Sequence, residues 1–409
     1  MNGQDALLAI DIGTTKICAV VAIRNERQVI EVAGVGIHPC SGLSANGIVN
    51  LEDITTSIGH ACSKALSQTT GIDIRQAVVG VSGCFMQSQN STGTVIISKH
   101  GRTVTLEDTH ACIQAAIART VPKDFEVVHQ IPRSYRVDDT YNIREPIGME
   151  GSALEVDVHL IIGRQSILKN LKRCVNKAGF RVEALAFQPI ASSYAVLTEE
   201  EKQTGVALID MGGQTTSVLA FYEGRFEHTE TLALGGEDIT RDLNHYFQTP
   251  YENAENLKKY TGSVLLEEID PEERIEVVRF KNRRTILVKK MRLCEIIEAR
   301  VEQILEEVVR LLRTRDLLGV LFGGIVLTGG SSLLEGIREK TQHITRRETH
   351  IGFPNGVVGY EEILTSPSYA TAIGLLHYGY MKRDEQLSLY GRGMKRVMKR
   401  VMQWVQETF

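Results

Sequence analysis

The chain has 409 residues, of which 43% are hydrophobic and 23% are charged, and its formal net charge is -4. This balance is ordinary for a folded protein, and the length allows two to four domains. No run of about 18 apolar residues occurs, and Asp5 and Asp11 interrupt the region where a signal peptide needs a basic start and an apolar core. These observations exclude a membrane-spanning or secreted body.

The seven cysteines are scattered, odd in number and never in a CxxC or Cys/His spacing typical of zinc ligands. We therefore expect reduced core thiols in a cytoplasmic protein, with no disulfide or zinc site.

The first 84 residues have the texture of an α/β sheet. The short β-branched runs LLAIDIG, KICAVVAI and QVIEVAGVGI predict strands, helical spacing covers residues 51–67, and AVVGVSG predicts another strand. From 85 to 162 the strands become more polar, with one helix-like stretch, LEDTHACIQAAIART, and several prolines. This change predicts an inserted domain. A helix over QSILKNLKRCVNKAG and the strand RVEALAF follow it.

The hairpin near the N-terminus is repeated in the second half of the chain. LLAIDIGTTKICAVVAI and GVALIDMGGQTTSVLAFY each contain an apolar strand ending in Asp-x-Gly, a Gly/Thr turn and a second apolar strand. Glycine turns let backbone N–H groups approach phosphate oxygens, and Thr14, Thr15 and Thr215 add hydroxyls. Asp11 and Asp210 at the strand ends suit a hydrated Mg²⁺. One such hairpin alone is more often an ordinary turn.

A third segment, FGGIVLTGGSSLLEGI, predicts a strand, a Thr-Gly-Gly turn and a helix capped by Ser331 or Ser332. This junction can bring a helix N-terminus against a nucleotide, although a plain strand-to-helix turn has the same pattern. No Walker motif and no GxGxxG fingerprint occurs.

These three segments, in this order, resemble the actin/Hsp70/sugar-kinase ATPase superfamily, and the two connecting helices of that superfamily match EALAFQPIASSYAVL and SYATAIGLLHYG. Within it, the chain resembles the FtsA family of bacterial cell-division actin homologues through ASSYAVL, GIVLTGG, TAIGLLHYG, the insert after VGVSG and the basic C-terminus. The resemblance covers nearly the whole chain. It implies an α/β actin-like ATPase fold, in which two Ribonuclease-H-like domains enclose a nucleotide cleft and one domain carries an FtsA-type inserted subdomain.

The resemblance also implies ATP and Mg²⁺ as cofactors, with at most weak ATPase activity. Asp11 and Asp210 would hold Mg²⁺ through water. The residues expected to bind the nucleotide are Asp11, Gly13, Thr14, Thr15, Lys16, Asp210, Gly212, Gly213, Gln214, Thr215, Gly236, Glu237, Glu255, Lys258, Gly329 and Gly330. Asp210 and Gln188 are the catalytic candidates. Gln188 matches the glutamine that orients the attacking water in actins, but Gln188 could also be a helix-surface glutamine.

The domain boundaries follow from the same resemblance. We expect the first actin-like domain at 1–84 and 163–197, the insert at 85–162, the second actin-like domain at 198–240 and 319–380, and a small subdomain at 241–318. A linker at 381–391 would lead to an amphipathic helix at 392–409.

A long helix is predicted over KKMRLCEIIEARVEQILEEVVRLL, with an apolar stripe on one side. The resemblance implies that it helps to form a groove for the C-terminal peptide of FtsZ, the division tubulin, with Arg292 and Arg300 facing the acidic peptide. Both arginines could instead be ordinary surface charges.

The last 19 residues carry five basic residues and one acidic residue, so they contribute +4 and the rest of the chain -8. On a helical wheel, one face gathers apolar side chains: Met394, Val397, Met398, Val401, Met402, Trp404, Val405 and Phe409. The other face is basic and polar. This pattern is typical of a helix lying in an anionic membrane surface, although a terminal helix docked on its own protein would share it.

We therefore expect an ATP-binding, actin-like protein that polymerises on the cytoplasmic face of the membrane at the division septum and anchors FtsZ. Other division proteins are expected partners, and nucleic acid is not. Two alternatives are an actin-like pilus-assembly scaffold and a small-molecule kinase of the same fold.

Overall fold

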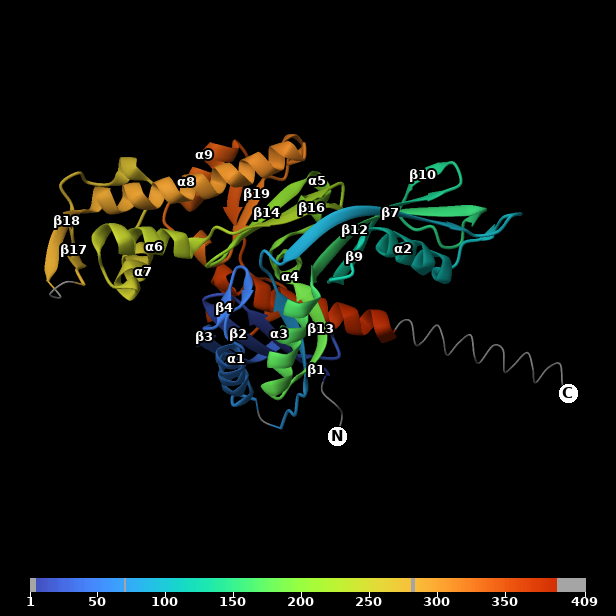
Figure 1. The fold of residues 1–409 in the computed structure, drawn as a ribbon, viewed down its shortest axis with the longest axis horizontal. Coiled ribbons are helices and arrows are strands. Elements are labelled where there is room, and N and C mark those ends of the chain that lie inside the picture. Colours follow the sequence, from blue (N-terminus) through green and yellow to red (C-terminus); the bar gives the residue numbers. More distant parts are fainter. Residues whose placement is uncertain (1–4, 70, 281–283, 388–409) are drawn as a thin grey trace.

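The computed structural model describes residues 5–69, 71–280 and 284–387. Two sheets lie at its centre. The inserted strands β7, β9 and β12 extend to one side, and the long helix α8 with the hairpin β17–β18 extends to the other (Figure 1).

The first sheet has six strands in the order β13-β6-β1-β2-β3-β21. β1 and β2 form the first predicted hairpin, and β6 runs parallel to β1. The bounds are β13 (Arg181–Phe187), β6 (Gln76–Val81), β1 (Asp5–Ile12), β2 (Lys16–Arg24), β3 (Ile30–Pro39) and β21 (Val357–Val358). The last six residues of β1 are all buried, because neighbours cover this central strand on both faces.

The second sheet repeats this arrangement with five strands, in the order β16-β15-β14-β19-β20. β14 and β15 form the second predicted hairpin, and β19 runs parallel to β14 as β6 does to β1. The bounds are β16 (Arg225–Leu232), β15 (Thr216–Tyr222), β14 (Val206–Met211), β19 (Ile325–Thr328) and β20 (Thr349–Ile351). The repeat seen in the sequence is therefore a repeat of topology.

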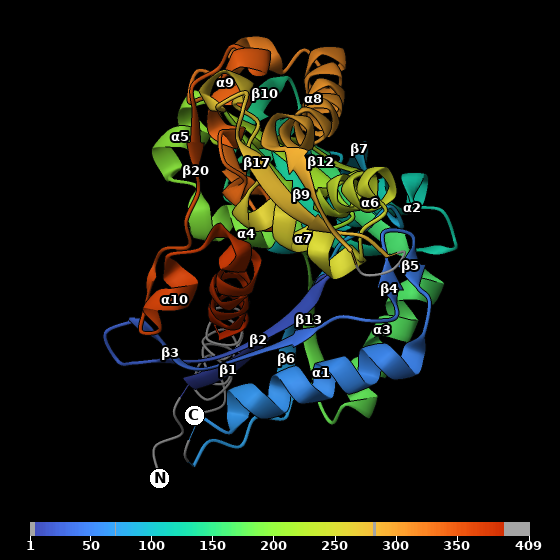
Figure 2. The same cartoon turned by 90° about the vertical axis from the view of Figure 1, so that its left-hand side faces the viewer.

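Helices cover the first sheet and connect the two halves. α1 (Leu51–Leu66), whose first turn is capped by the side chain of Asn50, lies below the sheet in Figure 2, and the helix over residues 370–387 lies above it. The smaller elements here are α3 (Gln165–Lys177), α4 (Gln188–Val196), α5 (Glu199–Thr204), α10 (Glu361–Leu364), β4 (Leu43–Ser44) and β5 (Gly47–Ile48). A 3₁₀ turn, η5 (Pro367–Tyr369), leads into the helix over 370–387.

α4 and the helix over 370–387 cross in close contact at Gly374. A Cβ built there would lie 1.7 Å from the carbonyl oxygen of Ala191 in α4. Only glycine lets the two connecting helices approach this closely.

Gly374→Ala is expected to lower the free energy of unfolding by about 3 kcal/mol, since the obstructing atom belongs to the backbone and cannot rotate away. Gly59→Ala is the matched control, because Gly59 lies inside α1 with no atom within 4 Å of a built Cβ. That change should stabilise the protein by about 0.5–1 kcal/mol. Urea unfolding of both variants measures the difference, and an equal effect of the two would contradict the crossing.

The insert is a four-stranded sheet, in the order β10-β9-β12-β7, packed against α2. Besides its connection to the first domain, it contacts the edge of the second sheet, where Ser88 donates to the carbonyl of Thr229 and Arg133 donates to the carbonyl of Phe226. Its elements are β7 (Met86–Ile96), β8 (Arg102–Thr103), α2 (Leu106–Thr120), β9 (Phe125–Val137), β10 (Thr140–Ile143), β11 (Glu150–Gly151) and β12 (Ala153–Arg164).

The remaining elements pack beside the second sheet. The predicted apolar stripe of α8 is buried there from Leu293 to Leu312. The elements are α6 (Gly236–Phe247), α7 (Tyr251–Tyr260), η1 (Leu266–Glu268), β17 (Arg274–Val278), β18 (Thr285–Lys289), α8 (Lys290–Thr314), η3 (Leu318–Val320), η4 (Gly330–Leu333) and α9 (Ile337–Thr345).

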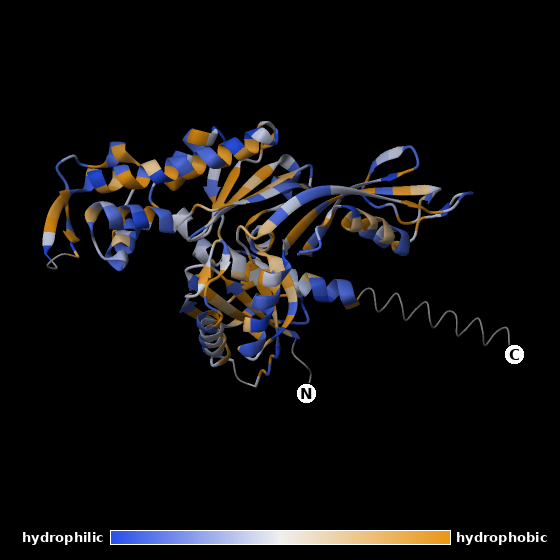
Figure 3. Ribbon diagram, in the orientation of Figure 1, coloured by the Kyte–Doolittle hydropathy of each residue, from blue (hydrophilic) through white to orange (hydrophobic). Residues whose placement is uncertain are grey.

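Buried apolar residues of the described part gather in three clusters, one around the first sheet, one around the second sheet with α8, and one in the insert. Apolar colouring is frequent in the strands near the centre of the molecule, whereas the inserted strands and the outer helices are mixed (Figure 3). Across the described ranges, no helix combines the length and hydropathy that crossing a membrane requires. All seven cysteines have free thiols.

Candidate nucleotide and metal site

Two carboxylates, one from each hairpin, are held by a single helix. The Gln188 side chain donates from Nε2 to Oδ1 of Asp11 at 2.7 Å, and the Ser192 hydroxyl donates to Oδ2 of Asp210 at 2.8 Å. Gln188 and Ser192 lie four residues apart in α4, on one face of the helix. Thr371 supports Ser192 from the helix over 370–387, with 2.9 Å between the hydroxyl oxygens. The structure therefore brings Asp11 and Asp210 to a common place.

Burial dominates the electrostatics of both acids. Asp11 is 7% exposed, and its pKa is raised to about 7, chiefly by burial; the Asp210 carboxylate contributes to the rise, whereas Lys16 and the Gln188 hydrogen bond oppose it. Burial also raises the pKa of Asp210, although hydrogen bonds from Ser192 and Thr371 oppose this. Raised carboxylate pKa values indicate negative charge that the protein alone does not fully compensate.

The two glycine turns face each other. A Cβ built on Gly213 would lie 2.4 Å from Cγ2 of Thr15 and 3.0 Å from Oγ1 of Thr14. The backbone N–H of Gln214 donates to the Thr14 hydroxyl at 3.3 Å. Each turn is closed in the same way, since Gly13 donates to the carbonyl of Lys16 and Gly212 donates to the carbonyl of Thr215.

The side chain of Gln214 bridges the two halves of the molecule. Its Oε1 accepts from the backbone N–H of Ala45 at 2.9 Å, and its Nε2 donates to Glu237 at 3.0 Å. The sequence predicted that Gln214 contacts the nucleotide, but no pattern in the sequence indicated its hydrogen bond to Ala45.

The third predicted segment lies directly against the second hairpin. Gly329 has φ +85°, and a Cβ there would lie 2.5 Å from Oδ1 of Asp210. Gly330 begins η4, and Ser331 donates to the carbonyl of Gly212 at 3.1 Å. The predicted helix capped by Ser331 or Ser332 is wrong: α9 begins only at Ile337, after Gly336 in the left-handed conformation, because Ser331 is bonded to the hairpin.

Three further candidates form one cluster with Gly236. Lys258 is 9% exposed, and its ammonium donates to the Gly236 carbonyl at 2.9 Å and to Glu255 at 2.7 Å. The backbone N–H of Glu237 donates to the carbonyl of Gly213 at 2.7 Å, which joins the cluster to the second turn. These residues lie beside the second turn, and their contact with a nucleotide stays a prediction.

The chemistry of this arrangement fits a magnesium nucleotide. Among the described residues, no group of three or more His, Cys, Asp or Glu side chains can enclose a metal ion. Two carboxylates suffice for Mg²⁺ that keeps its waters. The second glycine turn packs closely against its surroundings, since a Cβ on Gly213 would also lie 3.3 Å from Oε1 of Glu237, so backbone and not a side chain faces the opposite hairpin.

Lys16 and Gln188 have contacts that refine their predicted roles. The Lys16 ammonium lies 3.8 Å from the ring centroid of Tyr369. The second N–H of the Gln188 amide donates to the carbonyl of Ile12 at 3.0 Å, so both N–H groups are used within the protein. Gln188 thus positions Asp11, and its action on water stays a prediction.

Arg292 and Arg300 lie on α8, and Arg300 faces Asp242 of α6. They line a hollow of about 370 Å³ together with Asp242, Glu295, Ile296, Ala299 and Gln303. Arg300 binds both oxygens of Asp242, at 2.6 and 2.9 Å, and Arg292 binds Glu295 at 2.7 Å. An acidic ligand would therefore have to compete with these carboxylates.

Comparison with known proteins gives the family. The family model described as "Cell division protein FtsA" matches residues 207–374, and the model described as "SHS2 domain inserted in FTSA" matches residues 83–162. The cell division protein FtsA of Pseudomonas aeruginosa is 33% identical over 411 residues, covering 98% of each chain. The chain belongs to the FtsA family of cell division proteins. FtsA of Bacillus subtilis is 34% identical, covering 92% of this chain and 84% of its own.

Solved structures show the actin-like ATPase fold. A PilM-PilN type IV pilus biogenesis complex has a TM-score of 0.68 at 16% identity, covering 91% of this chain and 98% of that chain. MreB5 of Spiroplasma citri bound to ADP has a TM-score of 0.56 at 13% identity, covering 93% and 98%. At these identities the likeness concerns the fold alone. The two alternatives named from the sequence, a pilus-assembly scaffold and a small-molecule kinase, are therefore not favoured over the FtsA family.

Some predictions fall outside what the structure describes. The apolar face from Met394 to Phe409 belongs to residues 388–409, which lie outside the described residues. The exact domain boundaries stay predictions, but residues 381–387 of the expected linker continue the helix that begins at 370. The sequence reading missed Ser192 and Thr371; Ser192 could have been found from its place four residues after Gln188, whereas Thr371 had no signal of its own.

Proposed function

We propose that this FtsA-family protein binds Mg-ATP between its two hairpins. The observation that carries the proposal is that α4 holds Asp11 and Asp210 together through Gln188 and Ser192. Two buried carboxylates with raised pKa values gain a compensating cation when hydrated Mg²⁺ arrives with a nucleotide. When bound, Mg²⁺ would neutralise phosphate charge.

The protein's own residues would perform the other tasks. The glycine turns would present backbone N–H groups to phosphate oxygens, and the Gly329 segment, which packs against Asp210, would lie beside the nucleotide. A rise in the melting temperature of the wild-type protein with Mg-ATP tests the proposal, because ligands stabilise the folded state that they bind. An unchanged melting temperature at millimolar Mg-ATP would contradict the proposed nucleotide binding.

The second part of the proposal is capture of an acidic FtsZ peptide in the hollow beside α8. The hollow combines the apolar side chain of Ile296 with the guanidinium groups of Arg292 and Arg300. Guanidinium groups bind carboxylates through paired hydrogen bonds, as Arg300 already does with Asp242.

Arg300→Glu is expected to weaken binding of an FtsZ tail peptide at least tenfold, because it replaces attraction by repulsion. Arg310→Glu is the matched control, since Arg310 lies on the same helix and is also paired with a neighbouring carboxylate, Glu307. Fluorescence anisotropy with a labelled peptide measures both. Equal affinity of Arg300→Glu and wild type would mean that Arg300 is an ordinary surface charge.

The third part is self-association on a membrane, with the C-terminal residues as the anchor. The support is the apolar and basic pattern of residues 392–409 and membership of a cell-division family with an actin-like fold. Filaments at the cytoplasmic face of the septum would then carry FtsZ and other division proteins. ATP would govern assembly with little hydrolysis.

A further inference from the structure

The helix over residues 370–387 is bonded at both ends to the strands that carry the two carboxylates. At its start, Thr371 supports Ser192, which donates to Asp210 at 2.8 Å. Near its end, the Tyr380 hydroxyl lies 2.9 Å from the carbonyl oxygen of Asp5, the first residue of β1. Asp11 lies near the other end of the same strand. The helix and β1 therefore connect the carboxylate site with a distant edge of the first sheet.

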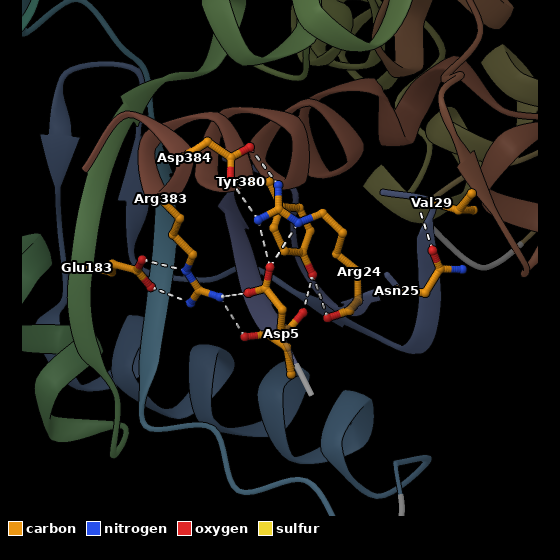
Figure 4. A network of polar contacts seen from close by, with 10 residues as sticks. Asp5, Arg24, Asn25, Val29, Glu183, Tyr380, Arg383 and Asp384 are labelled. Carbon is orange, nitrogen blue, oxygen red and sulfur yellow. Dashed lines mark hydrogen bonds and ion pairs between the residues drawn. The ribbon is translucent and has the colours of Figure 1, made fainter. Parts of the chain in front are cut away.

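A network of charged groups surrounds that distant end (Figure 4). Arg383 donates to both oxygens of Glu183 at 2.8 Å and to Asp5 at 3.0 Å. Arg24 donates to both oxygens of Asp384, at 2.7 and 2.8 Å, and to Asp5 at 2.9 Å. Asp5 thus accepts from both arginines, which join the helix to β1, β2 and β13.

Part of the network is withdrawn from solvent, although the side chains of Asp384 and Asp5 are 54% and 35% exposed. The Arg24 side chain is 9% exposed, and those of Glu183 and Arg383 are 19% and 22% exposed. Tyr380 is 2% exposed, and the Arg24 guanidinium lies 4.6 Å from its ring centroid. Paired arginine–carboxylate bonds have a fixed planar geometry, so they hold the helix end in one orientation.

We propose that these residues form a C-terminal clamp that couples the nucleotide site to the end of this helix, from which the chain continues into residues 388–409. The clamp consists of Asp5, Arg24, Glu183, Tyr380, Arg383 and Asp384. The inference rests on the proposed nucleotide binding. A bound magnesium nucleotide would fix Asp11 and Asp210 and so reduce the motion of β1 and Thr371. The helix over 370–387 would then reduce the motion of the clamp residues as well, because packed helices and strands move as rigid units.

The simpler explanation is a structural staple that holds the helix end but does not respond to nucleotide. Hydrogen–deuterium exchange of the full chain, with and without Mg-ATP, separates the two explanations. In wild type, Mg-ATP is expected to slow hydrogen exchange at residues 380–387 about fivefold or more. Coupling between two sites ordinarily changes an equilibrium constant by at least about this factor.

Arg383→Gln is expected to abolish this response, because it removes the bonds to Glu183 and Asp5. Asp384→Asn is a milder second variant, since Asp384 is more exposed and pairs with Arg24. Arg75→Gln is the control and should respond as wild type does, because the exposed Arg75 pairs with its neighbour Asp73. Melting curves with Mg-ATP report nucleotide binding for every variant.

Loss of the response in both clamp variants, with Mg-ATP still bound, would support the clamp. If wild type binds Mg-ATP without any change at 380–387, or if Arg383→Gln and Asp384→Asn keep the change, the network is a staple and the coupling is wrong while nucleotide binding stands. If wild type does not bind Mg-ATP, both proposals fail.

Discussion

Asp11→Asn and Asp210→Asn should each abolish the rise in melting temperature that Mg-ATP gives the wild-type protein. Each change removes one of the two carboxylates available to a hydrated Mg²⁺ but keeps the volume of the side chain. At a ligand concentration 100 times Kd, binding stabilises the wild type by about 2.7 kcal/mol, so its loss is easily measured. Asp73→Asn, at an exposed position, is the control and should keep the shift.

The same variants should be more stable than wild type when no nucleotide is added. The pKa of Asp11 is raised from 3.8 to about 7, so the folded state binds this proton more tightly than the unfolded state, and wild-type stability falls as pH rises from 4 to 7. Asp11→Asn escapes this loss and should gain at most about 4 kcal/mol above pH 7, a gain that shrinks toward pH 4. Chemical unfolding at pH 5 and pH 8 measures it. A variant that is less stable at both pH values would mean that Asp11 is a structural acid.

The hairpins, the connecting helices and the apolar stripe of α8 could be predicted because their signals are local. An apolar run that ends in Asp-x-Gly and resumes after a short turn specifies a hairpin, and β1–β2 and β14–β15 form as predicted. The spacing of apolar residues along α8 likewise determines which side is buried, so Leu293 and Leu312 lie in the core.

Contacts between distant residues could not be predicted in this way. Arg24 and Asp384 are 360 positions apart, and Thr371 supports Ser192 from 179 positions away. Periodicity contains no information on such pairs, which depend on how the two halves dock. The helix expected after the Thr-Gly-Gly turn failed for the same reason, because the hydroxyl of Ser331 is bonded to the hairpin at Gly212. Tertiary contacts overrode a local capping signal.

The proposed membrane anchor depends on a different kind of information, since its residues lie outside the described part of the chain and only their pattern supports it. Burying Trp404 and its apolar neighbours in the acyl boundary favours binding, and each basic residue near an anionic surface adds roughly 1 kcal/mol. Ordering the segment opposes both gains. One copy would therefore bind reversibly, and a filament carrying many copies would bind firmly, because the copies act at high effective concentration beside the membrane.

Trp404→Glu is expected to release the full-length protein from anionic vesicles, because it places a charge within the apolar face. Gln403→Glu is the matched control, since it adds the same charge to the adjacent polar face and should lower binding only slightly. Raising the salt concentration should weaken wild-type binding in part, because screening removes the electrostatic attraction but leaves the apolar insertion. Co-sedimentation with vesicles, with and without Mg-ATP, measures all three effects. If Trp404→Glu pellets as well as Gln403→Glu does, the C-terminal residues do not insert, and the binding to vesicles is through another surface.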